Sequence, residues 1–167
     1  GQGNVLSDCG KGITIEGTGA VSNTVVGNHI GVDASGQHAV PNEWQGIALY
    51  DGANYTIVGG SMRGLANVIA GNSRSGILIW SNHNRVVGNA IGVDATRSEP
   101  LPNGTSGIDL GHSAADNWIE QNVISGDGAG IQMTDAGTVG NAVVENYIGT
   151  NAAGSSSLGC SGLGILI

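Results

Sequence analysis

A nearly identical stretch of sequence occurs twice in this chain. NTVVGNHIGVDA at residues 23–34 returns as NRVVGNAIGVDA at residues 84–95, with ten of the twelve positions unchanged. A looser third copy, NAVVENYIGTNA, spans residues 141–152. Self-similarity at a fixed spacing is the signature of repeat proteins, in which each unit buries its apolar residues against the next unit. The chain is therefore expected to fold as a solenoid.

A shorter unit with three apolar pieces lies within this long period. The first piece is Asn-x-Ile or a close variant, and its asparagines are Asn4, Asn28, Asn67, Asn89, Asn122 and Asn146. The second piece is a glycine followed by alternating apolar residues, at 12–15, 46–49, 76–79, 107–110, 130–133 and 164–167. The third piece begins with an asparagine five residues before the next first piece, at Asn23, Asn84, Asn117 and Asn141. Residues 59–66 interrupt this spacing and are expected to form an inserted loop.

Short runs of β-branched residues separated by Gly and Asn are typical of strands joined by tight turns. No stretch sustains a helical period. Three short strands per coil and six coils follow, with each strand pairing with its equivalent in the next coil about 4.8 Å away. The recurrent asparagines are expected to stack as a structural hydrogen-bonded ladder. The third strand of the sixth coil is missing from the sequence.

This sixfold pattern, which covers essentially all 167 residues, resembles the right-handed parallel β-helix proteins of the pectate-lyase-like superfamily. The resemblance implies an all-β fold, a right-handed parallel β-helix of about six coils that forms one domain over residues 1–167. It implies no single activity, because lyases, hydrolases, epimerases, phage tailspikes and bacterial adhesins share this coil.

The turn between the first and second pieces alternates in length. It is short in coils 1, 3 and 5 and long in coils 2, 4 and 6, where it covers residues 31–45, 92–106 and 149–163. The 61-residue repeat is therefore two coils, one with a long loop and one with a short loop.

The charge of the chain limits the classes of partner that it is expected to bind. Five Lys and Arg residues stand against thirteen Asp and Glu residues, which gives a net charge of −8. Nucleic acids attract clustered basic side chains, so a nucleic-acid partner is not expected. No apolar run approaches the roughly 20 residues of a membrane span. Low Lys content, acidity and abundant Gly, Asn, Ser and Thr favour an extracellular or cell-surface protein.

An enzymatic function would need reactive residues in neighbouring coils. A polysaccharide lyase of this superfamily would carry stacked carboxylates for calcium beside a basic residue. The outward column of the second piece instead reads Thr14, Ala48, Leu78, Asp109, Gln132 and Leu166. It supplies one carboxylate and no base, so no catalytic residue is carried over from the resemblance.

A hydrolase-type alternative uses Asp109, Asp51 and His112. Two carboxylates could act as acid and base if they lay about 5 to 9.5 Å apart. The other interpretation of these residues is a polar turn with scattered charges.

Tyr50 and Trp80 follow equivalent strands of adjacent coils. Aromatic faces stack on sugar rings, so this pair is a candidate carbohydrate-binding platform. The alternative is that each ring only covers apolar turn surface.

Metal and cofactor motifs are scarce in this sequence. Asp33, Asp94 and Asn151 occupy the same place in the long loops. Repeated oxygen ligands raise a calcium hypothesis, although such residues more often cap their own turns. Zinc and nucleotide motifs do not occur, so no metal or cofactor is assigned.

The chain shows no plug at either end, which favours either a fragment of a longer solenoid or copies stacked head to tail. Cys9 and Cys160 occupy the same turn of the first and last coils, about 24 Å apart, so an internal disulfide is excluded. A stack would bring them together between subunits. Two unpaired thiols are the alternative.

Two classes of function remain open. The first is an extracellular structural or adhesive β-solenoid that assembles head to tail with copies of itself. The second is a carbohydrate-active enzyme, or a non-catalytic glycan-binding module, with polysaccharide or a cell-surface glycan as its partner.

Overall fold

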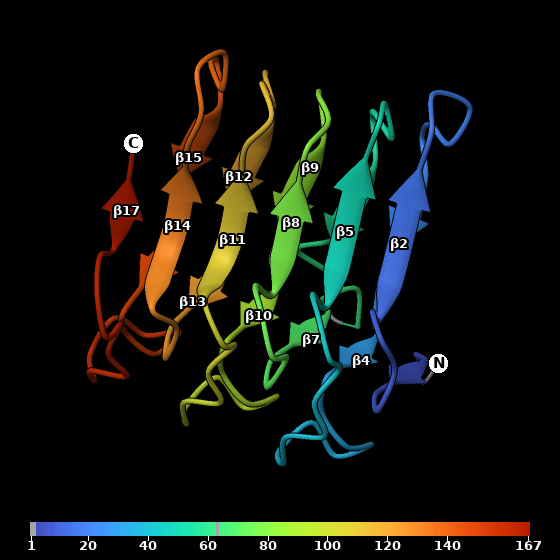
Figure 1. Cartoon of the computed structure of the whole chain (residues 1–167). Helices are drawn as coiled ribbons and strands as arrows, with labels where there is room; N and C mark the ends of the chain where they lie inside the picture. The colour runs from blue at the N-terminus through green and yellow to red at the C-terminus, as the bar shows by residue number, and fades with distance from the viewer. Residues whose placement is uncertain (1–2, 63) are drawn as a thin grey trace.

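The computed structural model describes residues 3–62 and 64–167, and these residues form only strands, turns and loops. The chain winds as a right-handed parallel β-helix of six coils (Figure 1). This confirms the predicted all-β fold. No described segment forms a helix of the length and apolarity that crossing a bilayer requires.

The three strands of each coil belong to three parallel sheets. Sheet A holds β1 (Val5–Leu6), β4 (His29–Ile30), β7 (Val68–Ile69), β10 (Ala90–Ile91), β13 (Val123–Ile124) and β16 (Tyr147–Ile148). Sheet B holds β2 (Ile13–Glu16), β5 (Ile47–Tyr50), β8 (Ile77–Ile79), β11 (Ser106–Leu110), β14 (Ala129–Met133) and β17 (Ile165–Leu166). Sheet C holds β3 (Thr24–Val25), β6 (Ile57–Gly59), β9 (Arg85–Val87), β12 (Trp118–Glu120) and β15 (Ala142–Val144).

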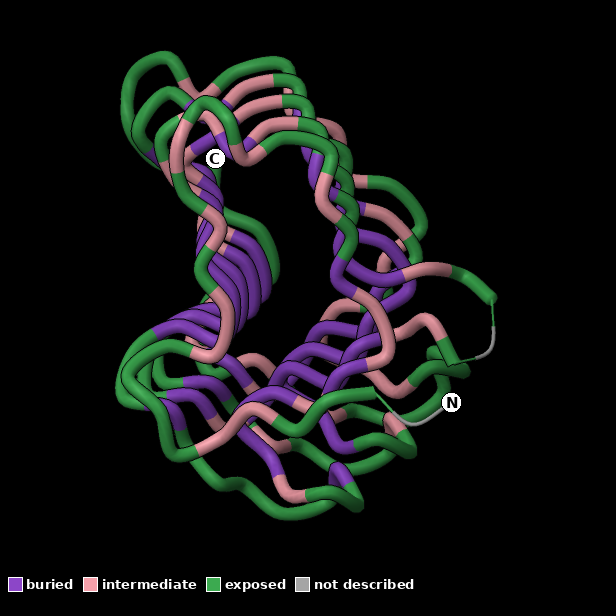
Figure 2. Tube along the Cα trace, turned by 90° about the vertical axis from the view of Figure 1, so that its right-hand side faces the viewer, coloured by how far each residue is buried: buried purple, intermediate pink, exposed green. Residues whose placement is uncertain are grey.

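The core is a column of aliphatic side chains that point inward from all three sheets. Each layer repeats the same few positions, such as Ile69 from sheet A, Ile77 and Ile79 from sheet B, and Val86 from sheet C. These residues are fully buried, and the buried segments line the inner wall of the coils in Figure 2. Because β-branched and Leu side chains fill each thin layer, the chain needs no Phe, and it has none.

The asparagines of the first piece stack at the corner where sheet C turns into sheet A. The side-chain Nδ2 of each one donates to Oδ1 of the next, at 2.9 Å from Asn4 to Asn28, 3.1 Å from Asn28 to Asn67, and 2.9 Å from Asn67 to Asn89. The ladder continues through Asn122 to Asn146. Each Oδ1 also accepts the backbone N–H of the preceding asparagine. The ladder therefore satisfies buried polar groups in every coil.

A second polar ladder follows the corner between sheets A and B. Asn42 Nδ2 donates to Asn72 Oδ1 at 2.8 Å, and Asn72 Nδ2 donates to Asn103 Oδ1 at 2.9 Å. Asn103 Nδ2 then donates to Oδ1 of Asp127 at 3.1 Å, where a carboxyl group replaces the amide. At the other end, the backbone N–H of Cys9 donates to Asn42 Oδ1 at 3.1 Å.

The long loops of coils 2, 4 and 6 fold against the outer face of sheet A. Each loop closes on itself through a short antiparallel bridge, such as Val32 with Ala39 and Val93 with Pro100. Outward side chains of sheet A and the loop residues form a second apolar cluster, which contains Val32, Val68, Ala70, Ala90, Val93 and Val123.

Candidate functional site

A run of three rings crosses adjacent coils at the end of sheet B. The rings of Tyr50 and Trp80 lie with their centroids 5.3 Å apart at 58°. The ring of His112 stacks on Trp80, with centroids 3.8 Å apart and planes at 23°. Lys11 Nζ lies 4.7 Å from the centre of the Tyr50 ring. The sequence placed Tyr50 beside Trp80, and the structure adds Lys11 and His112 to this run.

His112 joins the run because Gly111 has no side chain. The strand pairing puts Gly111 in the same column as Tyr50 and Trp80. A Cβ atom at Gly111 would lie 3.4 Å from Trp80 Nε1 and 3.1 Å from Asp135 Oδ2. The chain turns at His112, which has φ of 51°, and its backbone N–H donates to Asp135 Oδ2 at 3.1 Å. The imidazole thus occupies the place that a larger residue at position 111 would take.

A half-buried carboxyl group lies next to this run. Burial raises the pKa of Asp109, and the negative charge of Asp135 raises it further, while a hydrogen bond with the Gln132 side chain opposes both. Asp109 and Gln132 are direct neighbours across β11 and β14. The surface at this end of sheet B therefore combines aromatic rings with the Lys11 ammonium and several carboxyl groups, among them Glu16, which pairs with Tyr50 across β2 and β5.

Asp51 lies apart from the other residues of the hydrolase alternative. By strand register it shares a column with His112, but two coils separate them, which corresponds to about 10 Å. The structure therefore brings Asp109 and His112 to neighbouring positions and leaves Asp51 near Tyr50. The outward column of the second piece is not fully exposed. Ala48 and Leu78 belong to it and point away from the core, but both are buried.

The repeated loop residues Asp33, Asp94 and Asn151 cap their own turns. Asp33 Oδ1 accepts the backbone N–H of Gln37 at 3.1 Å, and Asp94 Oδ1 accepts that of Ser98 at 2.9 Å. Asn151 Oδ1 accepts the backbone N–H of Ser155 at 3.0 Å. Their oxygens are thus engaged in the loops themselves, as is typical of turn-forming Asx residues.

Cys9 and Cys160 are both free thiols. The column of the second ladder begins at Cys9 and passes through Asn42, Asn72, Asn103 and Asp127. Cys160 occupies the next place in this column, because the backbone N–H of Ser161 donates to the carbonyl of Asp127. The two thiols are thus equivalent positions of coils 1 and 6.

A comparison with known protein families gives a match that covers most of this chain. The family described as "Periplasmic copper-binding protein (NosD)" matches residues 34–157. Comparisons with curated proteins and with solved structures find no match.

The residues present do not fit the copper named in that description. Within residues 3–62 and 64–167, no three His, Cys, Asp or Glu side chains gather where they could hold a metal ion. Three of the four histidines have separate neighbours: His112 stacks on Trp80, His83 stacks on Tyr55, and His38 Nδ1 lies 3.1 Å from Asp33 Oδ2. Copper sites in proteins usually combine several imidazole or sulfur ligands around one point.

The family match and the fold support the same assignment. The matched segment begins in the long loop of coil 2 and ends in the long loop of coil 6, so it spans most of the winding. This chain belongs to the NosD family.

Proposed function

We propose that this chain is a non-catalytic adhesive β-solenoid that binds polysaccharide on the outer face of sheet B and works outside the cytoplasm. The observation that carries the proposal is the run of Tyr50, Trp80 and His112 across three coils. Aromatic faces pack against the apolar faces of sugar rings. The description of the matching family as periplasmic supports the location.

The polar groups beside the rings suit hydroxyl-rich ligands. Lys11 offers an ammonium donor at one end of the run, and Asp109 and Asp135 offer oxygens at the other end. Hydrolysis is the less favoured alternative, because the three residues suggested for it do not gather: Asp51 lies two coils from His112.

Replacing Trp80 with Ala is expected to weaken polysaccharide binding at least tenfold, because the middle ring of the run is lost. Affinity electrophoresis in gels that contain neutral or acidic polysaccharides measures this loss. Tyr147→Ala removes an exposed ring from sheet A and is the matched control that should bind as the parent does. Equal retardation of the Trp80→Ala and parent proteins would contradict the proposal. New reducing ends in the polysaccharide would favour the enzyme instead.

Head-to-tail stacking of copies is a second proposal, favoured by the equivalent places of Cys9 and Cys160. In a stack that continues the winding, Cys160 of one copy would lie one coil from Cys9 of the next, or about 4.8 Å. This spacing falls within the roughly 4.4–6.8 Å between Cα atoms of bridged cysteines. Burial raises the pKa of the Cys160 thiol, and the charge of Asp127 adds to the effect, so the bond would form slowly at neutral pH.

Oxidation with glutathione disulfide is expected to give a ladder of covalent multimers. Each intersubunit bond releases two thiol protons and transfers two electrons, which reduce one glutathione disulfide to two glutathiones. Non-reducing gel electrophoresis detects the ladder, and reduction should collapse it. Cys9→Ser and Cys160→Ser should each block multimers, while a mixture of the two variants should stop at dimers. Only monomers after oxidation of the parent protein would refute this bridge.

A further inference from the structure

A second ring-lined surface lies on the outer face of sheet C. An open hollow of about 480 Å³ is bordered by Tyr55, His83, Arg85, Asp116, Trp118 and Glu120. Its volume falls within the about 300–1,000 Å³ of small-molecule sites. It belongs to coils 2 to 4 and to a different sheet from the run around Trp80.

Two exposed aromatic groups form the borders of the hollow. The ring of Tyr55 is stacked on that of His83, with centroids 5.1 Å apart and planes at 9°. Tyr55 is 57% exposed and Trp118 is 46% exposed. Large rings so accessible to water cost free energy unless a partner covers them, so they suggest a ligand with an apolar face.

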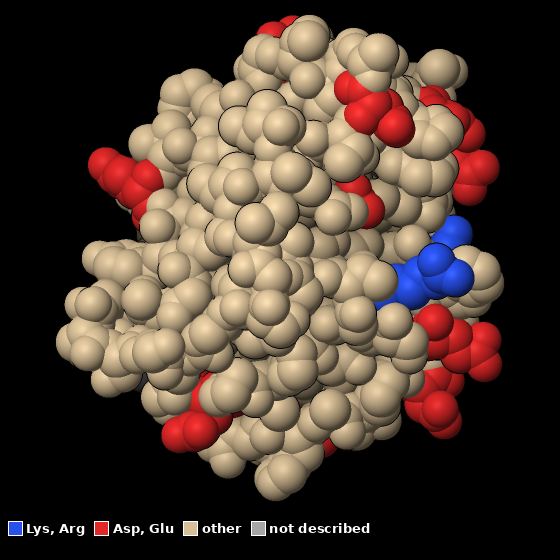
Figure 3. Space-filling model, turned by 60° about the vertical axis from the view of Figure 1, so that its left-hand side comes forward, with Lys and Arg blue, Asp and Glu red and all other residues tan. Residues whose placement is uncertain are grey.

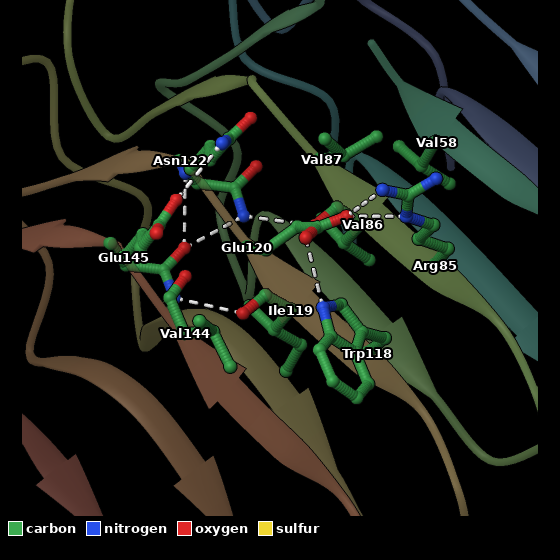
Figure 4. A network of polar contacts seen from close by, with 12 residues as sticks. Val58, Arg85, Val86, Val87, Trp118, Ile119, Glu120, Asn122, Val144 and Glu145 are labelled. Atoms are coloured by element: carbon green, nitrogen blue, oxygen red, sulfur yellow. Dashed lines mark hydrogen bonds and ion pairs between the residues drawn. The ribbon is translucent and has the colours of Figure 1, made fainter. Parts of the chain in front are cut away.

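The polar side of the hollow is held in one geometry. Glu120 accepts a hydrogen bond from Trp118 Nε1 at 2.9 Å and pairs with the guanidinium of Arg85 (Figure 4). Arg85 and Trp118 approach Glu120 from neighbouring strands, β9 and β12. The ion pair thereby sets a guanidinium donor and a carboxylate acceptor side by side next to the indole ring.

The backbone under Tyr55 and His83 adopts a turn that recurs from coil to coil before sheet C. One turn position before sheet C is left-handed in every described coil that has a strand there: Ser22, Tyr55, His83, Asp116 and Gly140, with φ between 56° and 69°. Glycine suits this conformation, whereas a bulky side chain is strained there. Coil 5 has Gly140 at this position, whereas coils 2 and 3 have the ring side chains of Tyr55 and His83.

We propose that this hollow on sheet C is a second binding site, which takes a sugar ring of a neutral glycan. Tyr55 and Trp118 contact the apolar faces of the ligand, and the adjacent donor and acceptor of Arg85 and Glu120 match neighbouring hydroxyl groups. Asp116 leaves an excess of negative charge among the lining residues, which disfavours anionic glycans. Figure 3 draws another face, toward the C-terminal end of the solenoid, where acidic side chains also outnumber basic ones.

A fluorescence experiment isolates this site from the one on sheet B. The chain has three tryptophans, Trp44, Trp80 and Trp118. The double variant Trp44→Phe with Trp80→Phe leaves Trp118 as the only indole. Titration with cellohexaose, xylohexaose and mannohexaose should shift its emission to the blue in a saturable way for at least one of them. Hexagalacturonate should bind at least tenfold more weakly.

Tyr55→Gly in the same background separates binding from stability. The variant removes the ring but gives the left-handed turn the residue that suits it, so the melting temperature should stay equal or rise while affinity falls at least tenfold. Ser22→Gly changes the same turn position in coil 1 and should leave affinity unchanged. No saturable response of Trp118, a preference for hexagalacturonate, or parent-like affinity of Tyr55→Gly would each overturn the proposal. The reverse double variant, Trp44→Phe with Trp118→Phe, reports on Trp80 alone, so failure at one sheet is distinguished from failure at the other.

Discussion

Asp127→Asn is expected to make the protein about 4 kcal/mol more stable than the parent at pH 8.5, and no more stable at pH 4. Asp127 is fully buried at the end of the second ladder, and its Oδ2 has no hydrogen-bond partner. In Asn72 and Asn103 the equivalent atom is Nδ2, and it donates to backbone carbonyls. An asparagine at position 127 would restore such a donor, as only the protonated acid can do.

The direction of the pH dependence follows from the pKa of Asp127. Burial raises this pKa from 3.8 to about 7, although hydrogen bonds from Asn103 oppose the rise. Between those two values the folded protein holds a proton that the unfolded chain has released. The free energy of unfolding therefore falls as pH rises through this window, by about 4 kcal/mol in total.

Urea unfolding of the parent and variant between pH 4 and pH 9 measures this effect. The difference between the two curves isolates position 127, because other titrating groups such as Asp109 are common to both proteins. We expect the difference to open between pH 4 and pH 7 and to stay constant above that range. Parallel curves across the whole range would show that Asp127 ionises normally in the folded protein.

Asn89→Ala is expected to cost about 4 kcal/mol of stability, because Asn89 is the middle of the first ladder. Its Nδ2 donates to Asn122 Oδ1 at 3.0 Å and to the Val58 carbonyl at 2.9 Å. Its Oδ1 accepts from both the backbone and side-chain nitrogens of Asn67. Each buried group left without a partner costs about 1–3 kcal/mol. Thermal or urea unfolding measures the loss.

Asn4→Ala is the matched control at the edge of the same ladder. Asn4 is exposed, and its side chain donates one hydrogen bond, to Asn28. Its loss should cost less than about 1 kcal/mol, because water can replace the partner. If the two substitutions prove equally costly, stacking of amides in the interior is not what stabilises the coils.

The strands and their register could be predicted because every coil repeats the same apolar positions, which the inner coils bury. A repeated Asn-x-Ile and Gly-Ile-x-Ile pattern fixes which residues align, so Tyr50 and Trp80 could be placed on neighbouring coils before the structure was seen. The inclusion of His112 could not be predicted, because it depends on the turn after Gly111 and on the hydrogen bond to Asp135.

Other features were missed because local sequence does not show them. Asp127 lies in a short turn whereas Asn103 lies in a long one, so their equivalence emerges only when the corners are aligned by hydrogen bonds. No aromatic column in the sequence pattern includes Trp118, because its neighbours across the strands of sheet C are Arg85 and Ala142. Alignment of the residues just before the third piece would have revealed Tyr55, His83 and Asp116 as a column.

The alternation of long and short loops has a consequence for how this architecture changes in length. Each long loop shields the outer apolar side chains of its own coil and of a neighbour, as Val32 and Val93 do around Val68 and Ala90. Gain or loss of a single coil would leave some of these side chains facing water without a shield. A tandem duplication or excision of 61 residues adds or removes two coils together with one long loop, so every long loop still covers its pair of coils. Genetic variation in length should therefore proceed in double steps, which explains why the two best-preserved copies lie 61 residues apart.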